Sequence, residues 1–289
     1  MKLLVCGSGA SEGIPALFCD CEICSRARQR QGREIRTRTA YQLDDAVRID
    51  FGPDLLAQQF KYDLHLVRLE HLFITHEHKD HYTPLNLIYR KSQYVKLNKI
   101  LHLHATGKLI AMAEKILHDN GSDFDSCMLR GDEITFFKPE EIVLEDGARL
   151  TVTPIASDHL PAGETCIYDI EYKSRRILIG TDSGIYPPET WEFFQGRRYD
   201  LMILDGTSGI LGLRHVHMGR ECVVETVERF RQLGTCGPDT LVLVNHFSHN
   251  GKMNHSDLEE YYSPHNIHPA WDGLKIDLEQ PGRFILPAE

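Results

Sequence analysis

The sequence predicts a layered α/β or α+β fold. Short apolar segments rich in β-branched residues alternate along the chain with longer segments of helical periodicity. The chain has 289 residues, of which 42% are hydrophobic and 26% charged, and it can bury a sizeable core. It contains no internal repeat, low-complexity tract or linker rich in Pro, Gly or Ser, so we expect a single domain over residues 1–289.

The strands are predicted where the short apolar segments lie. They cover residues 2–6, 39–43, 46–50, 72–75, 100–104, 150–155, 165–172, 176–180, 201–204 and 240–245. Two pairs of these strands predict hairpins, because a short polar connection joins them. The connections are Asp44-Asp45 in the first pair and Lys173-Ser174-Arg175 in the second.

The helices are predicted where longer amphipathic segments lie. They cover residues 22–31, 53–61, 83–94, 106–119, 188–194 and 219–233. Thr106 suits the N-cap of its helix and Gly121 suits the residue that ends it. The segment 119–140 shows the least regular pattern, and we expect it to be a surface excursion.

Charge and hydropathy exclude several classes of protein. The chain carries 42 acidic and 32 basic residues, a formal charge of −10. Nucleic-acid-binding proteins gain much of their affinity by neutralising phosphates, so this balance disfavours a nucleic-acid partner. No apolar run approaches the roughly 20 residues that span a bilayer, and we expect no membrane partner. The start of the chain lacks the apolar region of a secretory signal, which predicts a cytosolic protein.

The strongest chemical signal follows the apolar run 72–74. His76, His78, Asp80 and His81 lie within six residues, and their side chains are ligands that divalent metals such as zinc prefer. His76 and His78 point the same way in an extended backbone and can bind one metal, whereas the other two can turn toward a second. The alternative is a solvated polar turn, which four ligand-type side chains at this spacing disfavour.

A second metal signal lies near the N-terminus. Cys19, Cys21 and Cys24 have the spacing C-x-C-x2-C, and cytosolic thiols are kept reduced, so the cluster indicates metal ligation. Three thiolates suit a structural zinc, whose fourth ligand must come from elsewhere in the fold. We choose His249, three residues after His246. The alternative is three reduced cysteines without metal.

The H-x-H-x-D-H motif resembles the signature of the metallo-β-lactamase superfamily. His159, Asp182 and His246 match, in order, the places where that superfamily supplies its later ligands. The resemblance implies an αββα sandwich, in which two mixed β-sheets lie face to face between helices. It also implies two ligand groups, His76, His78 and His159 for one metal and Asp80, His81 and His246 for the other, with Asp182 shared.

Within the superfamily, the glycine-rich loop 7–15, the cysteine triplet and the closing N-H-x-x-H resemble the phosphonate-pathway phosphodiesterases that open phosphoribosyl cyclic phosphate. This resemblance implies two catalytic metals, zinc or manganese, and a separate structural zinc. It also implies a histidine as general acid before a late helix. His217 is the better match and His215 the reserve, while Asp50 resembles a strand-end Asp that supports the site.

The sequence therefore predicts a metal-dependent phosphodiesterase. We expect it to hydrolyse a small cyclic or nucleotide-like phosphodiester by attack of a hydroxide that bridges the two metals. Asp80 and His217 are the predicted catalytic residues, the first as a metal ligand and the second as the proton donor to the leaving oxygen. The sequence leaves open the natural substrate and the identity of the catalytic metals. It also leaves open the oligomeric state, for which a homodimer is one possibility.

Two rival functions have discriminating features. A tRNA 3'-end-processing endonuclease of the same superfamily would need a basic RNA-binding arm, and the best candidate, residues 89–99, is short. A non-hydrolytic protein like the B protein of pyrroloquinoline-quinone biosynthesis shares the cysteine triplet but is altered at the histidine motif, which is intact here. Lactamase, thioesterase and lactonase activities stay open, because the motif does not choose between carbon and phosphorus electrophiles.

Overall fold

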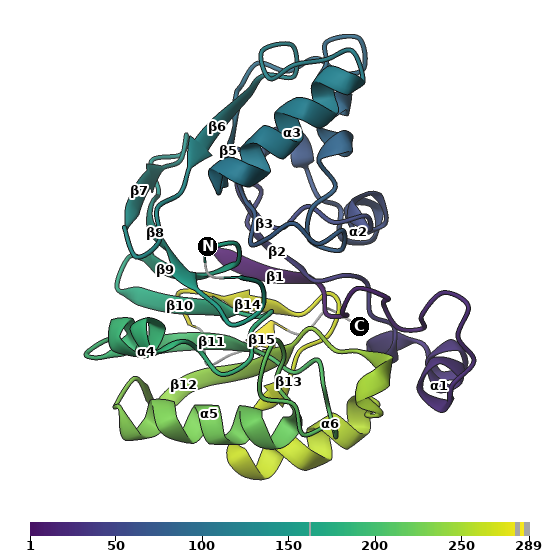
Figure 1. Ribbon diagram of the computed structural model, residues 1–289, viewed down its shortest axis with the longest axis vertical. Coiled ribbons are helices and arrows are strands. Elements are labelled where there is room, and N and C mark those ends of the chain that lie inside the picture. The colour runs from purple at the N-terminus through teal and green to yellow at the C-terminus, as the bar shows by residue number, and fades with distance from the viewer. Residues whose placement is uncertain (162, 281–283, 286–289) are drawn as a thin grey trace.

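Two mixed β-sheets lie face to face with helices on their outer sides in the computed structural model, which describes residues 1–161, 163–280 and 284–285 (Figure 1). The first sheet is ordered β15 (Phe284–Ile285), β14 (Lys275–Asp277), β1 (Lys2–Gly7), β2 (Ala40–Leu43), β3 (Val47–Ile49), β4 (His71–Phe73), β5 (Leu101–Ala105) and β6 (Leu129–Glu133). Its strands pair antiparallel from β15 to β3 and parallel from β3 to β6.

The second sheet has seven described strands. They are ordered β13 (His268–Pro269), β12 (Cys236–Asn245), β11 (Tyr199–Asp205), β10 (Arg175–Gly180), β9 (Cys166–Tyr172), β8 (Arg149–Ala156) and β7 (Glu140–Val143). Pairing is parallel from β13 to β10 and antiparallel from β10 to β7. The carboxyl ends of β10, β11 and β12 therefore meet at one edge of this sheet.

Most of the described helices lie on the outer faces of the two sheets. The helices are α1 (Glu22–Arg30), α2 (Leu55–Tyr62), α3 (Gly107–Asp119), α4 (Pro188–Phe194), α5 (Arg220–Gln232) and α6 (His255–Tyr262). Short 3₁₀ turns cover Gly32–Glu34, Leu66–Arg68, Pro84–Arg90, His249–Gly251 and Ser263–His265. Helices α4, α5 and α6 lie against the second sheet, and α2 and α3 lie beside the first (Figure 1). Within the described part of the chain, no helix is both long and apolar enough to cross a bilayer.

Successive side chains along each strand point to opposite faces of its sheet, so each sheet packs on two sides. In β11, Leu201 and Ile203 join the apolar cluster between the sheets, whereas Met202 and Leu204 join the cluster beneath the outer helices. Successive side chains of a strand point to opposite faces, so a strand buried on both sides is apolar throughout. This packing confirms the predicted αββα sandwich.

The structure confirms all ten predicted strands to within a few residues and both hairpins. It corrects two expectations. Residues 83–94 do not form an α-helix, since the turn Pro84–Arg90 is 3₁₀, with Asn86 N–H donating to the carbonyl of Thr83. The segment 119–140 is not only a surface excursion, because β6 pairs in parallel with β5. β6 is a polar strand at the sheet edge, where solvent exposure removes the apolar pattern.

Other elements had no counterpart in the sequence-based prediction. These are β7, β13, β14, β15 and α6. The N-terminus of α6 does carry a local signal, because Asn254 and Asp257 form a capping box in which each side chain accepts a hydrogen bond from the other residue's backbone N–H. The short strands at the sheet ends carry no comparable pattern.

Candidate metal centre

The first ligand group consists of three imidazoles that converge from two distant segments. His76 and His78 follow β4, and His159 follows β8. Nδ1 of His78 lies 3.0 Å from Nε2 of His76 and 3.0 Å from Nε2 of His159. Zinc–nitrogen bonds of about 2.0–2.1 Å place tetrahedral ligands roughly 3.3 Å apart, so these three nitrogens can bind one cation. The structure thus brings together the predicted first group.

The second ligand group lies beside the first. Nε2 of His81 is 3.3 Å from Nε2 of His246 and 3.1 Å from Oδ2 of Asp80. All three side chains are buried. Burial raises the pKa of Asp80, but His81 and His246 outweigh it and hold that pKa well below its usual range. This carboxylate is therefore held ready as an anionic ligand.

Asp182 lies between the two groups. Its Oδ2 is 3.3 Å from Nε2 of His81, and its Oδ1 is 3.2 Å from Nε2 of His246 and 3.8 Å from Nε2 of His159. Oδ2 is buried and has no hydrogen-bond partner among the described residues. A buried carboxylate oxygen without a partner is costly, so this donor set fits a divalent metal. Asp182 is also held at φ 59°, a left-handed conformation that costs energy and persists where the surrounding structure enforces it, as at functional sites.

A buried carboxylate orients the first and the last histidine of the motif. Asp50, at φ 67° just after β3, lies 2.6 Å from Nδ1 of His81. It accepts hydrogen bonds from the N–H and hydroxyl of Thr75, and that hydroxyl lies 2.9 Å from Nδ1 of His76. In both histidines Nδ1 is engaged and Nε2 faces the site, the arrangement by which outer residues orient metal ligands. Asp50 thus occupies the supporting position expected of it.

Asp205 organises the other side of the site and is absent from the sequence-based prediction. It ends β11 fully buried, and its Oδ2 accepts hydrogen bonds from the N–H of Asp182 and the hydroxyl of Thr207. Thr207 Oγ1 in turn lies 2.7 Å from Nδ1 of His246. A signal for Asp205 exists, because an Asp directly after the apolar run 201–204 stands at the same strand end as the predicted ligands.

His217 lies against the metal centre. Its Nδ1 is 3.1 Å from Oδ2 of Asp205, and its ring centroid is 4.7 Å from that of His159. Burial lowers the pKa of His217, but the charges of Asp205 and Asp182 outweigh it and raise that pKa to about 9. His215, the reserve candidate, is 84% exposed and pairs with Asp158 on the surface. The structure therefore places His217, and not His215, in the site.

The loop before α5 fixes His159 as well. Val216 has φ 67°, an unfavourable conformation for a β-branched residue, and its carbonyl accepts a hydrogen bond from Nδ1 of His159 at 3.1 Å. Nε2 of His159 is thereby left to face His78. One strained residue thus positions His159.

The ligand groups open into a hollow of about 540 Å³. Besides the histidines and aspartates of the site, it is lined by Glu12, Lys79, Met112, Ser248 and Asn250, among others. Clefts of several hundred Å³ are the usual size of small-molecule sites. The metal centre is therefore open to a ligand of nucleotide size.

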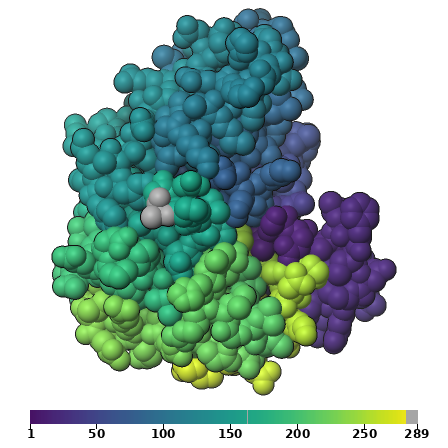
Figure 2. All heavy atoms as spheres, viewed as in Figure 1, coloured from purple at the N-terminus to yellow at the C-terminus, as the bar shows by residue number. Residues whose placement is uncertain are grey.

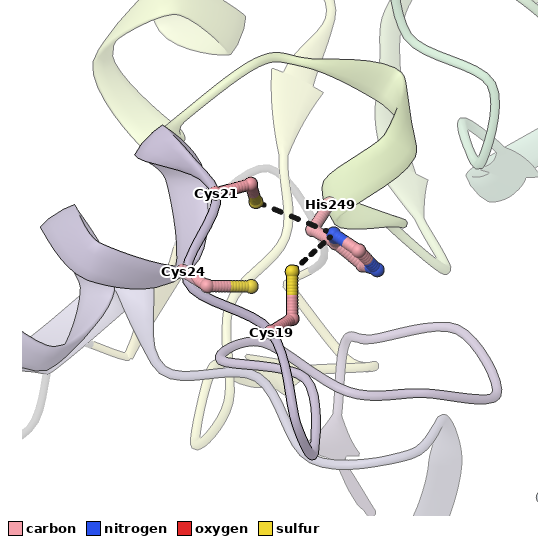
Figure 3. Close-up of side chains that lie close together, drawn as sticks. All are labelled: Cys19, Cys21, Cys24 and His249. Atoms are coloured by element: carbon pink, nitrogen blue, oxygen red, sulfur yellow. Dashed lines mark hydrogen bonds between the residues drawn. The ribbon is translucent and has the colours of Figure 1, made fainter.

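The cysteine triplet forms a separate cluster with His249 (Figure 3). Nδ1 of His249 lies 3.4 Å from Sγ of Cys21 and 3.6 Å from Sγ of Cys19, and Cys24 completes the group. Burial raises the pKa of Cys21, but hydrogen bonds from the Cys24 backbone and from His249 lower it to about 7. Three sulfurs and one nitrogen fit the ligand set of a tetrahedral zinc.

This cluster joins two segments that are distant in the sequence. In Figure 2 the purple N-terminal segment lies against the yellow C-terminal part, and Arg26 donates a hydrogen bond to Ser256 across that contact at 2.9 Å. The structure thus places all the predicted ligands in the expected groups.

Residues 46–246 match the family described as a beta-lactamase superfamily domain. A curated relative, an octanoyltransferase of Porphyromonas gingivalis, is 25% identical over 287 residues, which cover 98% of this chain and 52% of that protein. The chain therefore spans about half the length of the curated relative that it matches.

Solved structures of other proteins match nearly the whole length of this chain. A diphosphatase from the PhnP family is 25% identical with a TM-score of 0.69, and the match covers 95% of this chain and 96% of that one. Zn(2+)-bound PqqB from Methylobacterium extorquens is 18% identical with a TM-score of 0.72 over 96% and 100% of the two chains. Human tRNase Z, short form, is 15% identical with a TM-score of 0.64 over 96% and 99%. The last two similarities show the fold alone.

Proposed function

Because the chain belongs to the β-lactamase superfamily and is thus a metal-dependent hydrolase, we propose that it cleaves a small cyclic or nucleotide-like phosphodiester. The observation that carries this proposal is the position of Asp182 between two imidazole groups, beside the His217–Asp205 pair. Similarity to a diphosphatase of the PhnP family supports a phosphorus electrophile over a carbon one.

The proposed cofactors are two divalent cations, zinc or manganese. His76, His78 and His159 would hold one, Asp80, His81 and His246 the other, and Asp182 both. When bound, such a pair would acidify a water molecule and neutralise negative charge on the phosphoryl oxygens. The Cys19–Cys21–Cys24–His249 cluster would hold a structural zinc outside the catalytic hollow.

The protein itself would supply the proton for the leaving group. Asp205 engages Nδ1 of His217, so Nε2 is the nitrogen free to donate. When the P–O bond breaks, the departing oxygen takes the proton from this nitrogen, and the charge of Asp205 stabilises the protonated ring beforehand. His217 is the proposed general acid, and Asp205 is a positioning residue.

The proposal of a small substrate rests on two observations. One is the size of the hollow, and the other is that basic residues of the segment 89–99 bind groups within the fold. Arg90 donates hydrogen bonds to three backbone carbonyls, those of Lys99, Cys127 and Met128. Lys99 pairs with Glu70 and Glu145. Arg90 and Lys99, two of the four basic residues of this segment, thus stabilise the fold and are not displayed on an arm, which disfavours the tRNA-processing alternative.

A second candidate function is the hydrolysis of an acyl ester or thioester. It is favoured by one observation, the match to an octanoyltransferase over 98% of this chain. The ligand groups themselves do not choose between an acyl carbon and a phosphoryl group. An octanoyl thioester therefore belongs in any substrate panel.

The test is a substrate panel offered to purified, metal-loaded protein. It comprises bis(4-nitrophenyl) phosphate, ribosyl cyclic phosphates, linear nucleotide diesters, a precursor tRNA and an octanoyl thioester. We expect the small phosphodiesters to give the highest kcat/KM. Faster cleavage of the precursor tRNA or of the thioester would replace the proposal with the corresponding alternative. Metal bound at the cysteines alone, with no diester cleaved, would favour the non-hydrolytic alternative.

A further inference from the structure

The cysteine cluster, which consists of the cysteine triplet and His249, borders the catalytic hollow. His249 follows His246 of the proposed catalytic centre with only two residues between them. Ser248 and Asn250, the neighbours of His249 in the chain, both line the hollow. One short segment therefore carries a ligand of each metal group and part of the wall of the hollow.

The N-terminal loop packs against this segment. The N–H of Phe247 donates a hydrogen bond to the carbonyl of Ser8, and the N–H of Ala10 donates to the carbonyl of Phe247, each at 2.9 Å. Ala10 and Glu12 line the hollow together with Ser248. The same loop leads along the chain to the cysteine triplet. The two segments that supply the ligands of the cysteine cluster thus also form this part of the hollow.

Glu12 connects the two sites. Nδ1 of His249 faces the sulfurs, and Figure 3 shows the other ring nitrogen, Nε2, pointing away from them. This Nε2 lies 3.6 Å from Oε1 of Glu12, within ion-pair distance. The same carboxylate oxygen accepts a hydrogen bond from the hydroxyl of Ser248. One carboxylate thus contacts both the histidine of the cysteine cluster and the wall of the hollow.

Glu12 stands where an outer residue orients a metal ligand. A carboxylate behind the second nitrogen of a metal-binding imidazole fixes the ring and raises its basicity. Asp50 is placed in this way behind His81 in the catalytic centre. The side chains of Glu12 and His249 are 29% and 14% exposed, so water screens their contact less than it screens a surface ion pair. The contact can therefore hold the ring in place.

We propose that Glu12 is a positioning residue that couples zinc binding at the cysteine cluster to the shape of the catalytic hollow. The inference rests on the structural zinc and the hydrolase activity proposed above. When His249 is fixed as a ligand, its Nε2 holds the carboxylate of Glu12, and this carboxylate in turn holds the hydroxyl of Ser248 in the wall. Without the metal, the wall loses that support.

The coupling acts on substrate binding rather than on the chemical step. Glu12 and Ser248 line the hollow but belong to neither catalytic ligand group. The nearest catalytic ligand in the chain, His246, is oriented independently by Thr207, whose Oγ1 lies 2.7 Å from its Nδ1. Loss of zinc from the cysteine cluster should therefore raise KM and leave kcat nearly unchanged.

The first experiment measures zinc binding at the cysteine cluster of the full-length protein. Cobalt is titrated in and followed by its thiolate-to-cobalt charge-transfer absorption, a band that the histidine and aspartate ligands of the catalytic centre do not give. Displacement of cobalt by zinc then yields the zinc dissociation constant. We expect Glu12→Gln to raise this constant by about 10–100-fold. The matched control, Glu22→Gln, removes the same charge from an exposed residue next to Cys21, and we expect it to bind zinc as wild type does.

Glu12→Asp separates orientation from charge and serves if Glu12→Gln does not fold. It keeps the carboxylate but shortens the side chain by one methylene, which withdraws the carboxylate from His249. We therefore expect weaker zinc binding than in wild type. Wild-type zinc affinity in either folded variant of Glu12 would overturn the proposal, as would equal losses in Glu12→Gln and Glu22→Gln.

The second experiment measures the kinetics of Cys21→Ser, which lacks a ligand of the zinc. We expect KM for the small phosphodiester to rise severalfold with kcat nearly unchanged, and an unchanged KM after loss of the zinc would overturn the coupling. A wild type that gives no thiolate-to-cobalt band would refute the structural zinc and this inference with it. The titration needs no turnover, so a wild type that cleaves no diester would instead refute the proposed function alone.

Discussion

His255→Gln tests a buried hydrogen-bonded network around the guanidinium of Arg36. Nη2 of Arg36 donates a hydrogen bond to Nδ1 of His255 at 2.9 Å, and Nη1 of the same guanidinium donates to the hydroxyl of Ser8 and the carbonyl of Ala270. Burial, together with the nearby charges of Arg36 and Arg33, lowers the pKa of His255 to about 3. Glutamine can accept the same hydrogen bond but does not titrate.

The sign and size of the effect follow from the pKa. An unfolded histidine titrates near 6.5, so the folded protein binds the proton of His255 less tightly than the unfolded chain does. The contribution of neutral His255 to the free energy of unfolding is therefore fully present above pH 6.5 and is lost as the pH falls toward 3. pH 5 lies 1.5 units below the unfolded pKa. At about 1.4 kcal/mol per unit, the free energy of unfolding therefore falls by about 2 kcal/mol at that pH.

The assay is urea unfolding of wild type and His255→Gln at pH 7.5, 6 and 5. Other groups that titrate in this range, metal ligands included, contribute to both proteins and cancel in the difference. We expect the stability of wild type minus that of the variant to fall by about 2 kcal/mol between pH 7.5 and pH 5. His118→Gln, on an exposed histidine, serves as control. A difference that is constant over this range would refute the reasoning.

Three further predictions concern the proposed metal centre. Asp80→Ala should lose most phosphodiester hydrolysis while its circular dichroism stays that of wild type, and wild-type turnover would contradict the assigned ligand. His217→Gln should lower kcat by about 10²–10⁴-fold for alkyl leaving groups and far less for 4-nitrophenolate, which needs no proton; equal losses for both would rule out a general acid. Cys21→Ser should lower the thermal midpoint and remove one zinc equivalent, and metal analysis that finds the wild-type content would exclude the structural site.

Structural features that are set by a short stretch of the chain could be predicted from the sequence. The apolar run 201–204 and the H-x-H-x-D-H motif are local, because the period of an extended strand places His76 and His78 on one side whatever the rest of the chain does. The later ligands were assigned through a resemblance, since nothing near Asp182 in the sequence indicates that it lies between two groups of imidazoles.

Supporting residues were harder to predict. Thr207 orients His246 from a position 39 residues away along the chain, and Asp205 comes within 3.8 Å of the same ring because β11 and β12 pair in parallel with Asp205 opposite Asn245. A carboxylate after an apolar run is common, so its role emerges only when the ends of neighbouring strands are known.

By itself the sequence determined the layered class, most strands and helices, the cysteine triplet and the histidine motif, because hydrophobic periodicity and ligand spacing are properties of short segments. Tertiary structure alone decided that Asp205 supports the centre, that residues 129–133 form an edge strand, and that Glu12 lies against His249 and Ser248. These features depend on strand order and on contacts between segments that are distant in the sequence. Pairing between distant strands is set by the packing of the whole chain, and no short segment encodes it.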